Sequence, residues 1–549
     1  MAQFVIKDGV AIIPDGTTEI GREAFYKCSS LTSVTIPDSV TSIGRYAFKS
    51  CTSLKSITIP ESVTEIGRYA FSDCTALESI IISKSVKAIG WEAFEGCTAL
   101  ESIVVADGNP VYDSREGCNA IIETARNTLI KGCKTTVIPT SVTKIVNDAF
   151  INCTSLESII ISKSVTEIGR EAFNGCTSLK SIVVADGNPV YDSREGCNAI
   201  IETATNTLIQ GCKTTVIPES VTEIGHSAFS GCTSLKSITI PASVTKIGGF
   251  AFSDCTALES ITIPESVTEI REDAFYGCTS LKSITIPETV TEIKGSAFID
   301  CTSLESITIP ESVTEIGNDV FKGCKSLKSI IIPNSVTEIG GYAFYGCTSL
   351  TSIIIPDSVT EIGEDAFNGC TSLESITIPN SVTKIGDYAF NGCTSLESVT
   401  IPEGVTEIGD WAFNGCTSLK SIIIPELVTE IGDNVFRDCT SLKSITIPEV
   451  VTEIGASAFK GCTSLESIVI HKGVKEIRGY ALAGCTSLTT LTLPIGVNKI
   501  DGYVFYNCRA LATIYVPAKK ADYYKQRLPA ELHDKIVELA PEKKTKVKK

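Results

Sequence analysis

The chain has few of the residues on which enzyme active sites most often depend. Its 549 residues include three histidines, two tryptophans and one methionine. The histidines, His226, His471 and His533, lie far apart in the sequence, and no cysteine has the C-x-x-C spacing that holds zinc. Phosphate-binding segments of the G-x-x-x-x-G-K or G-x-G-x-x-G kind are also missing. We therefore expect no enzymatic activity, no catalytic residues, no metal and no cofactor.

Long apolar runs are missing as well. Although 43% of the residues are hydrophobic, no segment approaches the length needed to cross a bilayer. The start, Met1–Phe4, has no basic residues, no apolar stretch and no cleavage site of the kind that directs secretion. We expect a cytoplasmic protein without a membrane span, and the alternative is the cell surface, reached by an unconventional route.

Positive charge is in the minority. The chain has 47 basic and 64 acidic residues, a net charge of −17, and five of its lysines fall in the basic tail, residues 542–549. A surface this acidic repels the phosphate backbone of nucleic acids, so we expect no nucleic-acid partner. We interpret the tail as a solvated end, with a nucleic-acid or membrane contact as the minor alternative.

What the chain has in abundance is one repeated unit of 23 residues. The copy from Cys51 to Asp73 reads C-T-S-L-K-S-I-T-I-P-E-S-V-T-E-I-G-R-Y-A-F-S-D. A fixed period predicts a stack of coils, each in contact mainly with its neighbours. Within a unit, the alternation in I-T-I predicts a strand that ends at the proline. V-T-E-I predicts a second extended piece, and A-F-x-x-C predicts a tight turn after glycine.

The cysteines follow the repeat. Nineteen of the 23 occur at the same position of the unit, where the side chain faces the core. A buried free cysteine behaves as a small apolar residue, so we interpret this column as a ladder of thiols. Two further pairs, Cys118/Cys133 and Cys197/Cys212, flank the interruptions described next. We expect these four to be reduced, and disulfides in an oxidising compartment are the alternative.

Two long coils, at about 103–135 and 182–214, interrupt the period. Each contains D-G-N-P and then two short apolar runs around a polar turn, a pattern that predicts a protruding hairpin. Ser102–Ala125 is identical to Ser181–Ala204, which indicates duplication of a 79-residue block. The hairpins are either a tolerated insertion or a recognition ridge.

The ends differ from the repeats. Asp8-Gly9 between two apolar triplets predicts a hairpin over the first coil. After about 22 coils in residues 1–517, the spacing of Leu528, Leu532, Ile536 and Leu539 predicts a helical cap over residues 518–541. Open solenoids need such covers at both ends.

The units, as in Ala366–Gly386, closely resemble the BspA-type (treponemal-type) leucine-rich repeats over about residues 10–517. This resemblance implies a right-handed, mainly β leucine-rich-repeat solenoid. It also implies a parallel sheet on the concave face and short extended and turn segments on the convex face. Family members include bacterial surface antigens, some of which are adhesins that bind matrix proteins. The family supplies no catalytic residues.

The candidate contact surface is the central outward position of the predicted strand. It is uncharged, β-branched and repeated, which suits contact with a protein. We expect a monomeric, non-catalytic scaffold that binds an unidentified protein ligand through the concave sheet or the hairpin ridge. The alternative is a cell-surface or secreted adhesin for host or matrix proteins. The candidate contact residues are Thr239, Thr262, Thr285, Thr308, Ile331, Ile354, Thr377, Thr400 and Ile423.

Overall fold

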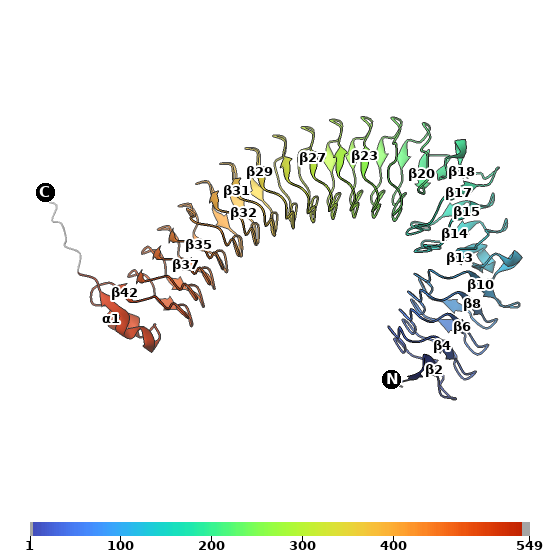
Figure 1. Cartoon of the computed structure of the whole chain (residues 1–549), viewed down its shortest axis with the longest axis horizontal. Coiled ribbons are helices and arrows are strands. Elements are labelled where there is room, and N and C mark those ends of the chain that lie inside the picture. Colours follow the sequence, from blue (N-terminus) through green and yellow to red (C-terminus); the bar gives the residue numbers. More distant parts are fainter. Residues whose placement is uncertain (1–3, 541–549) are drawn as a thin grey trace. The chain divides into compact units, whose positions relative to one another are not determined.

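The computed structural model describes residues 4–540 and contains two compact units, one up to Val267 and one from Thr268. Both are parallel-strand solenoids, with about 23 turns in the part of the chain described (Figure 1). Each ordinary coil has three sides. In one coil these are β6 (Ser56–Thr58), β7 (Glu65–Ile66) and the seven residues 67–73 that end before the cysteine. We call these sides the first ladder, the second ladder and the A-F arc.

In the first unit, strands of successive coils pair in parallel without register shift, as Ile57 with Ile80 and Ile80 with Ile103. The first ladder contains β2 (Val10–Ile12), β4 (Ser33–Thr35), β6, β8 (Ser79–Ile82), β10 (Ser102–Val105), β15 (Ser158–Ile161), β17 (Ser181–Val184) and β23 (Ser260–Thr262). The second ladder contains β3 (Glu19–Ile20), β5 (Ser42–Ile43), β7, β9 (Ala88–Ile89), β14 (Lys144–Ile145), β16 (Glu167–Ile168), β21 (Glu223–Ile224) and β22 (Lys246–Ile247).

The second unit repeats the same two ladders. Its first ladder contains β25 (Ser283–Thr285), β27 (Ser306–Thr308), β28 (Ser329–Ile331), β29 (Ser352–Ile354), β31 (Ser375–Thr377), β33 (Ser398–Thr400), β36 (Ser444–Thr446), β38 (Ser467–Val469), β40 (Thr490–Thr492) and β42 (Thr513–Val516). The second ladder contains β24 (Glu269–Ile270), β26 (Glu292–Ile293), β30 (Glu361–Ile362), β32 (Lys384–Ile385), β34 (Glu407–Ile408), β35 (Glu430–Ile431), β37 (Glu453–Ile454), β39 (Glu476–Ile477) and β41 (Lys499–Ile500).

The two long coils lie in the first unit, and both contain the predicted hairpin. Its strands pair antiparallel with a bulge, β12 with β13 and β19 with β20. The elements of the first long coil are β11 (Tyr112–Asp113), η1 (Arg115–Gly117), β12 (Ala120–Glu123), η2 (Thr124–Arg126) and β13 (Thr128–Gly132). Those of the second are β18 (Tyr191–Asp192), η3 (Arg194–Gly196), β19 (Ile200–Glu202) and β20 (Thr207–Gln210).

The A-F arc is a third set of coil-to-coil contacts. The backbone N–H groups of Tyr46, Phe48 and Ser50 donate to carbonyls of the next coil at 3.1, 2.7 and 2.8 Å. Tyr46 and Ser50 have left-handed backbones, with φ of 60° and 62°. The residue before A-F is left-handed in coil after coil, whatever its type, and includes Tyr69, Trp411 and other bulky residues that rarely adopt this conformation. This strain persists because neighbouring coils hold the backbone on both sides.

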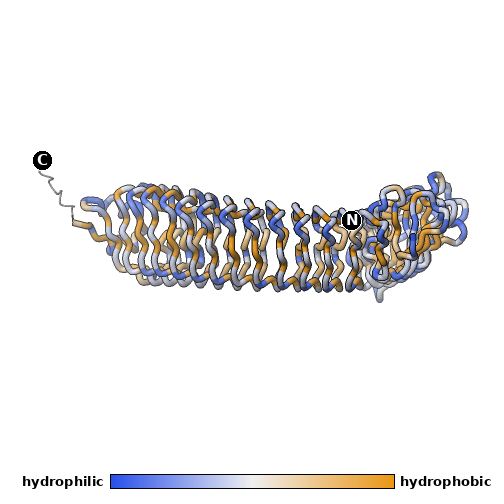
Figure 2. The backbone as a smooth tube through the Cα atoms, turned by 90° about the horizontal axis from the view of Figure 1, so that it is seen from above, coloured by the Kyte–Doolittle hydropathy of each residue, from blue (hydrophilic) through white to orange (hydrophobic). Residues whose placement is uncertain are grey.

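The core of each coil is organised around one phenylalanine and one cysteine. Rings of successive coils stack, as Phe25 on Phe48 and Phe48 on Phe71, with centroids 4.9 and 5.2 Å apart. Most ladder cysteines donate their S–H to a phenylalanine carbonyl 26 residues earlier, as Cys74 Sγ does to Phe48 O at 3.1 Å. Figure 2 shows apolar and polar positions alternating in the same order along successive coils. The column of cysteines is therefore a set of buried hydrogen-bond donors as well as apolar filling.

The N-terminal hairpin agrees with the prediction. Strand β1 (Val5–Lys7) pairs antiparallel with β2, and the turn residues Asp8 and Gly9 have φ of 48° and 81°, as a two-residue turn of this kind requires.

The C-terminal cap is only partly helical. It contains α1 (Ala521–Lys525) and η4 (Ala530–Lys535), and then β43 (Ile536–Glu538) pairs in parallel with β42. The prediction of one helical face from Leu528 to Leu539 is therefore wrong beyond Lys535. The exposed edge of β42 offers unpaired backbone groups, and β43 satisfies them. The basic tail lies outside the described residues.

We expect Phe367→Ala to lower the free energy of unfolding by about 3–5 kcal/mol. Phe367 is fully buried and stacks on Phe344 and Phe390 at 5.3 and 5.4 Å, so the cavity should weaken three coils together. Denaturant unfolding gives the energy, and hydrogen exchange gives the affected coils. Thr377→Ala, at an exposed position, is the control and should change stability by less than ~0.5 kcal/mol. Protection lost only within the Phe367 coil would contradict the nearest-neighbour picture.

We also expect native thiol labelling to begin at Cys28. It is half-buried, whereas the other 22 cysteines are free and buried. Burial raises the pKa of most ladder thiols, for example that of Cys393 to about 12, so little reactive thiolate forms there. Mass spectrometry after brief alkylation should find Cys28 modified first and all 23 modified in denaturant. Equal native labelling of Cys28 and Cys393 would contradict the buried ladder.

Candidate functional site

The candidate contact residues of the second unit form a continuous row on the first ladder. Parallel pairing from β25 to β33 places each central residue opposite its counterpart in the next coil. The row is exposed, with Ile331 at 76% and Ile354 at 77%. In the first unit, Thr239 and Thr262 are joined by a parallel bridge in the same position. The aligned residues of the second unit are Thr285, Thr308, Ile331, Ile354, Thr377 and Thr400.

The row changes character at Ile423, which is 82% exposed. Its coil forms no strand of the first ladder, and Ser421 makes only a single bridge to Ser398. A hollow of about 640 Å³ lies on the Thr400 side of Ile423, and one of about 290 Å³ lies on the Thr446 side. Ile423 therefore stands as an apolar ridge between two recesses.

The same central position in the first unit forms an apolar stripe outside the candidate contact residues. Six successive coils carry aliphatic residues there, and all six side chains are exposed, from 41% to 72%. These residues align with Thr58 of the repeat, in coils that read I-I-I, I-V-V or T-V-I at this place. The stripe contains Ile81, Val104, Val137, Ile160, Val183 and Val216.

The long coils of the first unit have no A-F arc. In the first of them, only Ile130, Lys131 and Gly132 join Leu129 to Cys133, where an ordinary coil uses seven residues. The chain can take this short path because the hairpin has already returned it to the second ladder, where Leu129 of β13 pairs with Ile145 of β14.

Glycine is required on this short path. The N–H of Gly132 donates to Ala149 O at 3.0 Å, which replaces part of the missing arc. A Cβ on Gly132 would lie 2.1 Å from the ring of Phe150, and one on Gly211 would lie 2.2 Å from Phe229. Close packing of the next phenylalanine therefore fixes the path in both long coils.

The missing arc leaves an opening between the arcs on either side, which we call the first cleft. At one end these arcs touch, since Asn152 Nδ2 donates to Glu95 Oε1 at 3.5 Å and Ser155 Oγ donates to Thr98 O at 3.1 Å. The rest is a cavity of about 510 Å³, within the usual range of ligand pockets. It is lined by Ile89–Glu95, Ile130, Lys131, Lys144, Val146–Asp148, Ile151, Glu167 and Gly169.

A second cleft occurs at the second long coil, as the duplication requires. It is smaller, about 220 Å³. His226 Nε2 lies 3.6 Å from Glu171 Oε1, and both residues line the cleft. Its lining residues are Ile168–Phe173, Thr207, Ile209, Gln210, Glu223 and Gly225–Ser227.

Carboxylates in and beside the first cleft repel one another. Burial and then Glu92 raise the pKa of Glu95 to about 7. Burial and then Glu171 and Glu92 raise the pKa of Asp148 to about 6, against the lowering effect of Lys131. Like charges this close make the ionised forms unfavourable, a state more often found at binding sites than in structural surfaces.

The hairpins do not protrude as predicted. Ala120, Ile121, Ile122 and Leu129 are fully buried, because the hairpin strands continue the second ladder instead of leaving it. The cysteines that flank each hairpin are buried free thiols. The sequence pattern identified the hairpin but not its burial.

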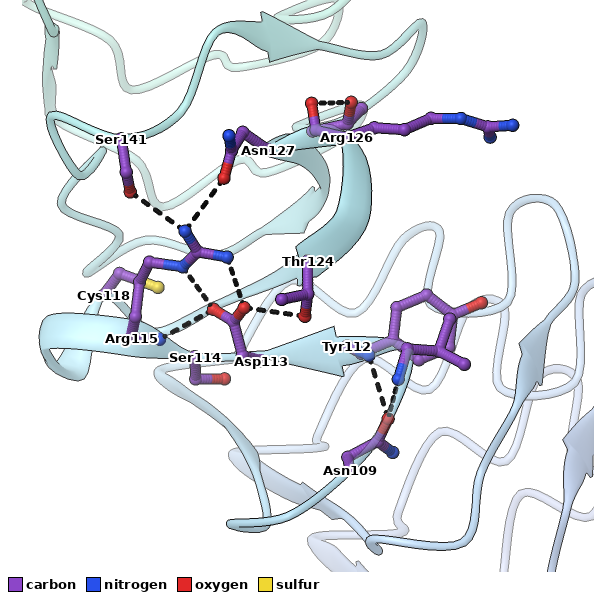
Figure 3. Close-up of polar contacts among 12 residues, drawn as sticks. Asn109, Tyr112, Asp113, Ser114, Arg115, Cys118, Thr124, Arg126, Asn127 and Ser141 are labelled. Atoms are coloured by element: carbon purple, nitrogen blue, oxygen red, sulfur yellow. Dashed lines mark hydrogen bonds and ion pairs between the residues drawn. The ribbon is translucent and has the colours of Figure 1, made fainter.

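An ion pair holds the loop before each hairpin (Figure 3). Arg115 contacts Asp113 at 2.5 Å and also donates to Asn127 Oδ1 at 2.9 Å and to Ser141 Oγ at 3.3 Å. Burial alone would raise the pKa of Asp113, but hydrogen bonds from Arg115 and Thr124 lower it. Arg115 therefore joins the loop to Ser141 of the following coil and to Asn127 at the turn of the hairpin. These contacts also fix the position from which the short path begins.

The histidines are separate in space as in sequence. His226 lines the second cleft, and His533 Nε2 lies 3.0 Å from Leu528 O in the cap. Among the described residues, no group of three or more His, Cys, Asp or Glu side chains could hold a metal ion. Between residues 4 and 540, no helix has the length and apolar character that a bilayer span demands.

Comparison with known families decides the identity of the repeat. The profile of the BspA type leucine rich repeat region matches residues 10–114, 126–194, 209–328, 314–443 and 412–526, which together cover most of the chain. The chain belongs to the BspA-type leucine-rich repeat family. The long coils supply the unmatched residues 115–125 and 195–208, where the hairpins interrupt the repeat.

Several solved leucine-rich repeat structures are similar to this chain. A leucine-rich repeat protein from Bacteroides ovatus is 25% identical, with 97% of this chain and 94% of that chain covered and a TM-score of 0.39. A leucine rich cell surface protein from Faecalibacterium prausnitzii is 31% identical, with coverage of 67% and 86% and a TM-score of 0.38. The Treponema pallidum leucine rich repeat protein is 31% identical, with coverage of 36% and 82% and a TM-score of 0.29. No curated protein matches the chain.

We expect Glu95→Gln to stabilise this BspA-type solenoid at about pH 8 more than at about pH 5. The pKa of Glu95 is raised to about 7 in the folded protein, above its ordinary value of 4.5, so the folded state loses stability as pH rises through this interval. Because the side chain is about half exposed, solvent screening should reduce the gain to on the order of 1 kcal/mol. Denaturant unfolding at both pH values measures it. An equal effect of the substitution at both pH values would contradict the raised pKa.

Proposed function

We propose that this chain is a non-catalytic, monomeric scaffold that binds a protein ligand along the face of its first ladder. The observation that carries the proposal is the exposed, uncharged row from Thr285 to Thr400, aligned coil by coil and followed by Ile423 between two recesses. Aligned apolar and β-branched side chains that stay exposed are typical of interaction surfaces. Leucine-rich-repeat solenoids generally serve as non-enzymatic scaffolds.

The net charge of −17 supports a protein over a nucleic acid as the ligand, because phosphates would be repelled. The row itself carries no charge, so binding there should depend on shape and apolar contact, with little dependence on salt. The apolar stripe of the first unit offers a second surface of the same kind.

We propose the cytoplasm as the compartment of this scaffold. The ladder thiols support it, because most of them donate their S–H to a carbonyl, as Cys74 and Cys393 do, and must be reduced to do so. A surface adhesin is the second candidate, favoured by the relative from Faecalibacterium prausnitzii that is described as a cell surface protein. Fractionation of the source cells, with protease treatment of intact cells, separates the two. Cleavage of the chain in intact cells would exclude a purely cytoplasmic protein.

The surface is tested by charge substitution. Ile331→Lys, Ile354→Lys and Ile423→Lys together should weaken capture of a protein ligand at least about tenfold, since three charged groups would have to be buried. The measurement is crosslinking and mass spectrometry with the immobilised chain in extract and spent medium of the source organism.

The matched control puts the same charges on another side of the coils. Thr337→Lys, Thr360→Lys and Thr429→Lys replace exposed residues just before the second ladder position. A ligand captured by the parent chain and by this control, but not by the triple isoleucine variant, is the expected result. Capture that the isoleucine substitutions leave unchanged would refute binding at this face.

A further inference from the structure

The first cleft has a composition that coil stacking does not require. An ordinary arc fills this space with its own alanine and phenylalanine, whereas here Trp91, four carboxylates and two lysines surround a cavity of about 510 Å³. We propose that the first cleft binds an organic cation that carries an apolar body. It lies at the missing arc and not on the first ladder, so its failure would leave the proposed function untouched.

The apolar body would meet the walls of the cleft. Phe94 ends one run of stacked phenylalanines and Phe150 begins the next, so Phe94 lines open space and not another ring. Ile130 of the short path and Ile151 of the following arc add aliphatic surface. Trp91, half exposed, lines the same cavity, and Arg68 lies over its ring at 5.1 Å. A ring or an aliphatic stem would bury these surfaces.

The charge of the ligand follows from the polar groups. Lys144 and Glu167 neutralise each other at 2.5 Å. Glu92, Glu95 and Asp148 then face the cavity with only Lys131 to offset them, an excess of negative charge.

The surrounding charges do not remove this excess. The negative charge of Asp73 raises the pKa of Glu95, and that of Glu171 raises the pKa of Asp148. Lys49 lowers the pKa of Glu95, but it is itself paired with Asp73 at 3.3 Å. A bound ammonium or guanidinium group would relieve the repulsion, whereas an anion would increase it.

The duplicated block provides an internal comparison. Residues 91–169 and 170–248 differ at 18 positions, and nine of these 18 line the first cleft. The second block has Arg170, Asn174, Gln210 and Ser227 where the first has Trp91, Glu95, Lys131 and Asp148, and all of these but Asn174 line their cleft. The framework is thus the same in both clefts, but the second lacks the tryptophan and the carboxylates that correspond to Glu95 and Asp148, and it has Glu223 in place of Lys144. Only the first should bind the cation.

The test uses the full chain with Trp411→Phe, which leaves Trp91 as the single tryptophan and a fluorescent reporter in the cleft. At about pH 8, where both Glu95 and Asp148 are ionised, phenethylamine should change the emission along a saturable curve. Phenethyl alcohol has the same body without the charge and should bind at least about tenfold more weakly. Binding of the amine should weaken towards about pH 5 as the carboxylates take up protons.

A second set of titrations, with peptides, distinguishes a basic side chain of a protein from a free amine as the source of the cation. A capped Leu-Lys-Leu tripeptide and its Leu-norleucine-Leu counterpart are titrated in the same way. Tighter binding of the lysine peptide than of phenethylamine would identify a basic side chain of a protein as the ligand, and the reverse would identify a free amine. No charge-dependent change with either cation up to about 10 mM would overturn the proposal.

Two variants locate the binding. Glu95→Gln combined with Asp148→Asn removes the charge with little change of volume and should weaken phenethylamine binding at least about tenfold. Glu223→Gln removes a carboxylate of the second cleft and should leave binding unchanged. Calorimetry repeats the measurement without the reporter. Equal binding by the parent and the double variant would overturn the proposal.

Discussion

The backbone hydrogen bonds of the A-F arc set the spacing at which the coils stack. They require two left-handed residues in each coil, such as Tyr46 and Ser50, and a strained backbone of this kind persists only where its surroundings determine it. The same bonds bring successive phenylalanine rings to about 5 Å and place each cysteine sulfur within reach of a phenylalanine carbonyl. Ring stack, thiol contacts and arc are therefore one arrangement, and a single coil could not maintain any of them.

The clefts are what remains where the long coils interrupt this arrangement. The second ladder starts again at each long coil, because β13 pairs with β14 and β20 pairs with β21, whereas neither pairs with the ordinary strand before it. The arc does not continue, since three residues cannot follow the path of seven. The walls of the recess are residues that elsewhere would be covered by the next arc.

Much of the fold could be predicted from sequence because its causes are local. The strand that ends at Pro60, the Asp8-Gly9 turn and the hairpins all follow from patterns within a few residues. The predictions that were wrong concern segments whose structure depends on neighbours that are distant in the sequence. Ile536 continues a ladder because β42 leaves an open edge, and the hairpin strands are buried because the second ladder includes them. The first cleft was missed because an inserted hairpin reads as added chain, whereas its effect is the loss of the arc between Phe94 and Phe150.

The left-handed column before A-F holds glutamate, tyrosine, tryptophan, serine, aspartate and asparagine on one unchanged backbone. Because hydrogen bonds to the next coil determine the conformation there, the identity of the side chain is free to vary. Such a column can acquire new surface chemistry by single substitutions, one coil at a time, while the frame stays constant. A recess, in contrast, had to be made once by inserting a segment, copied with its block, and only then diversified. The surface of this protein can therefore be altered by single substitutions, whereas a cavity requires an inserted segment.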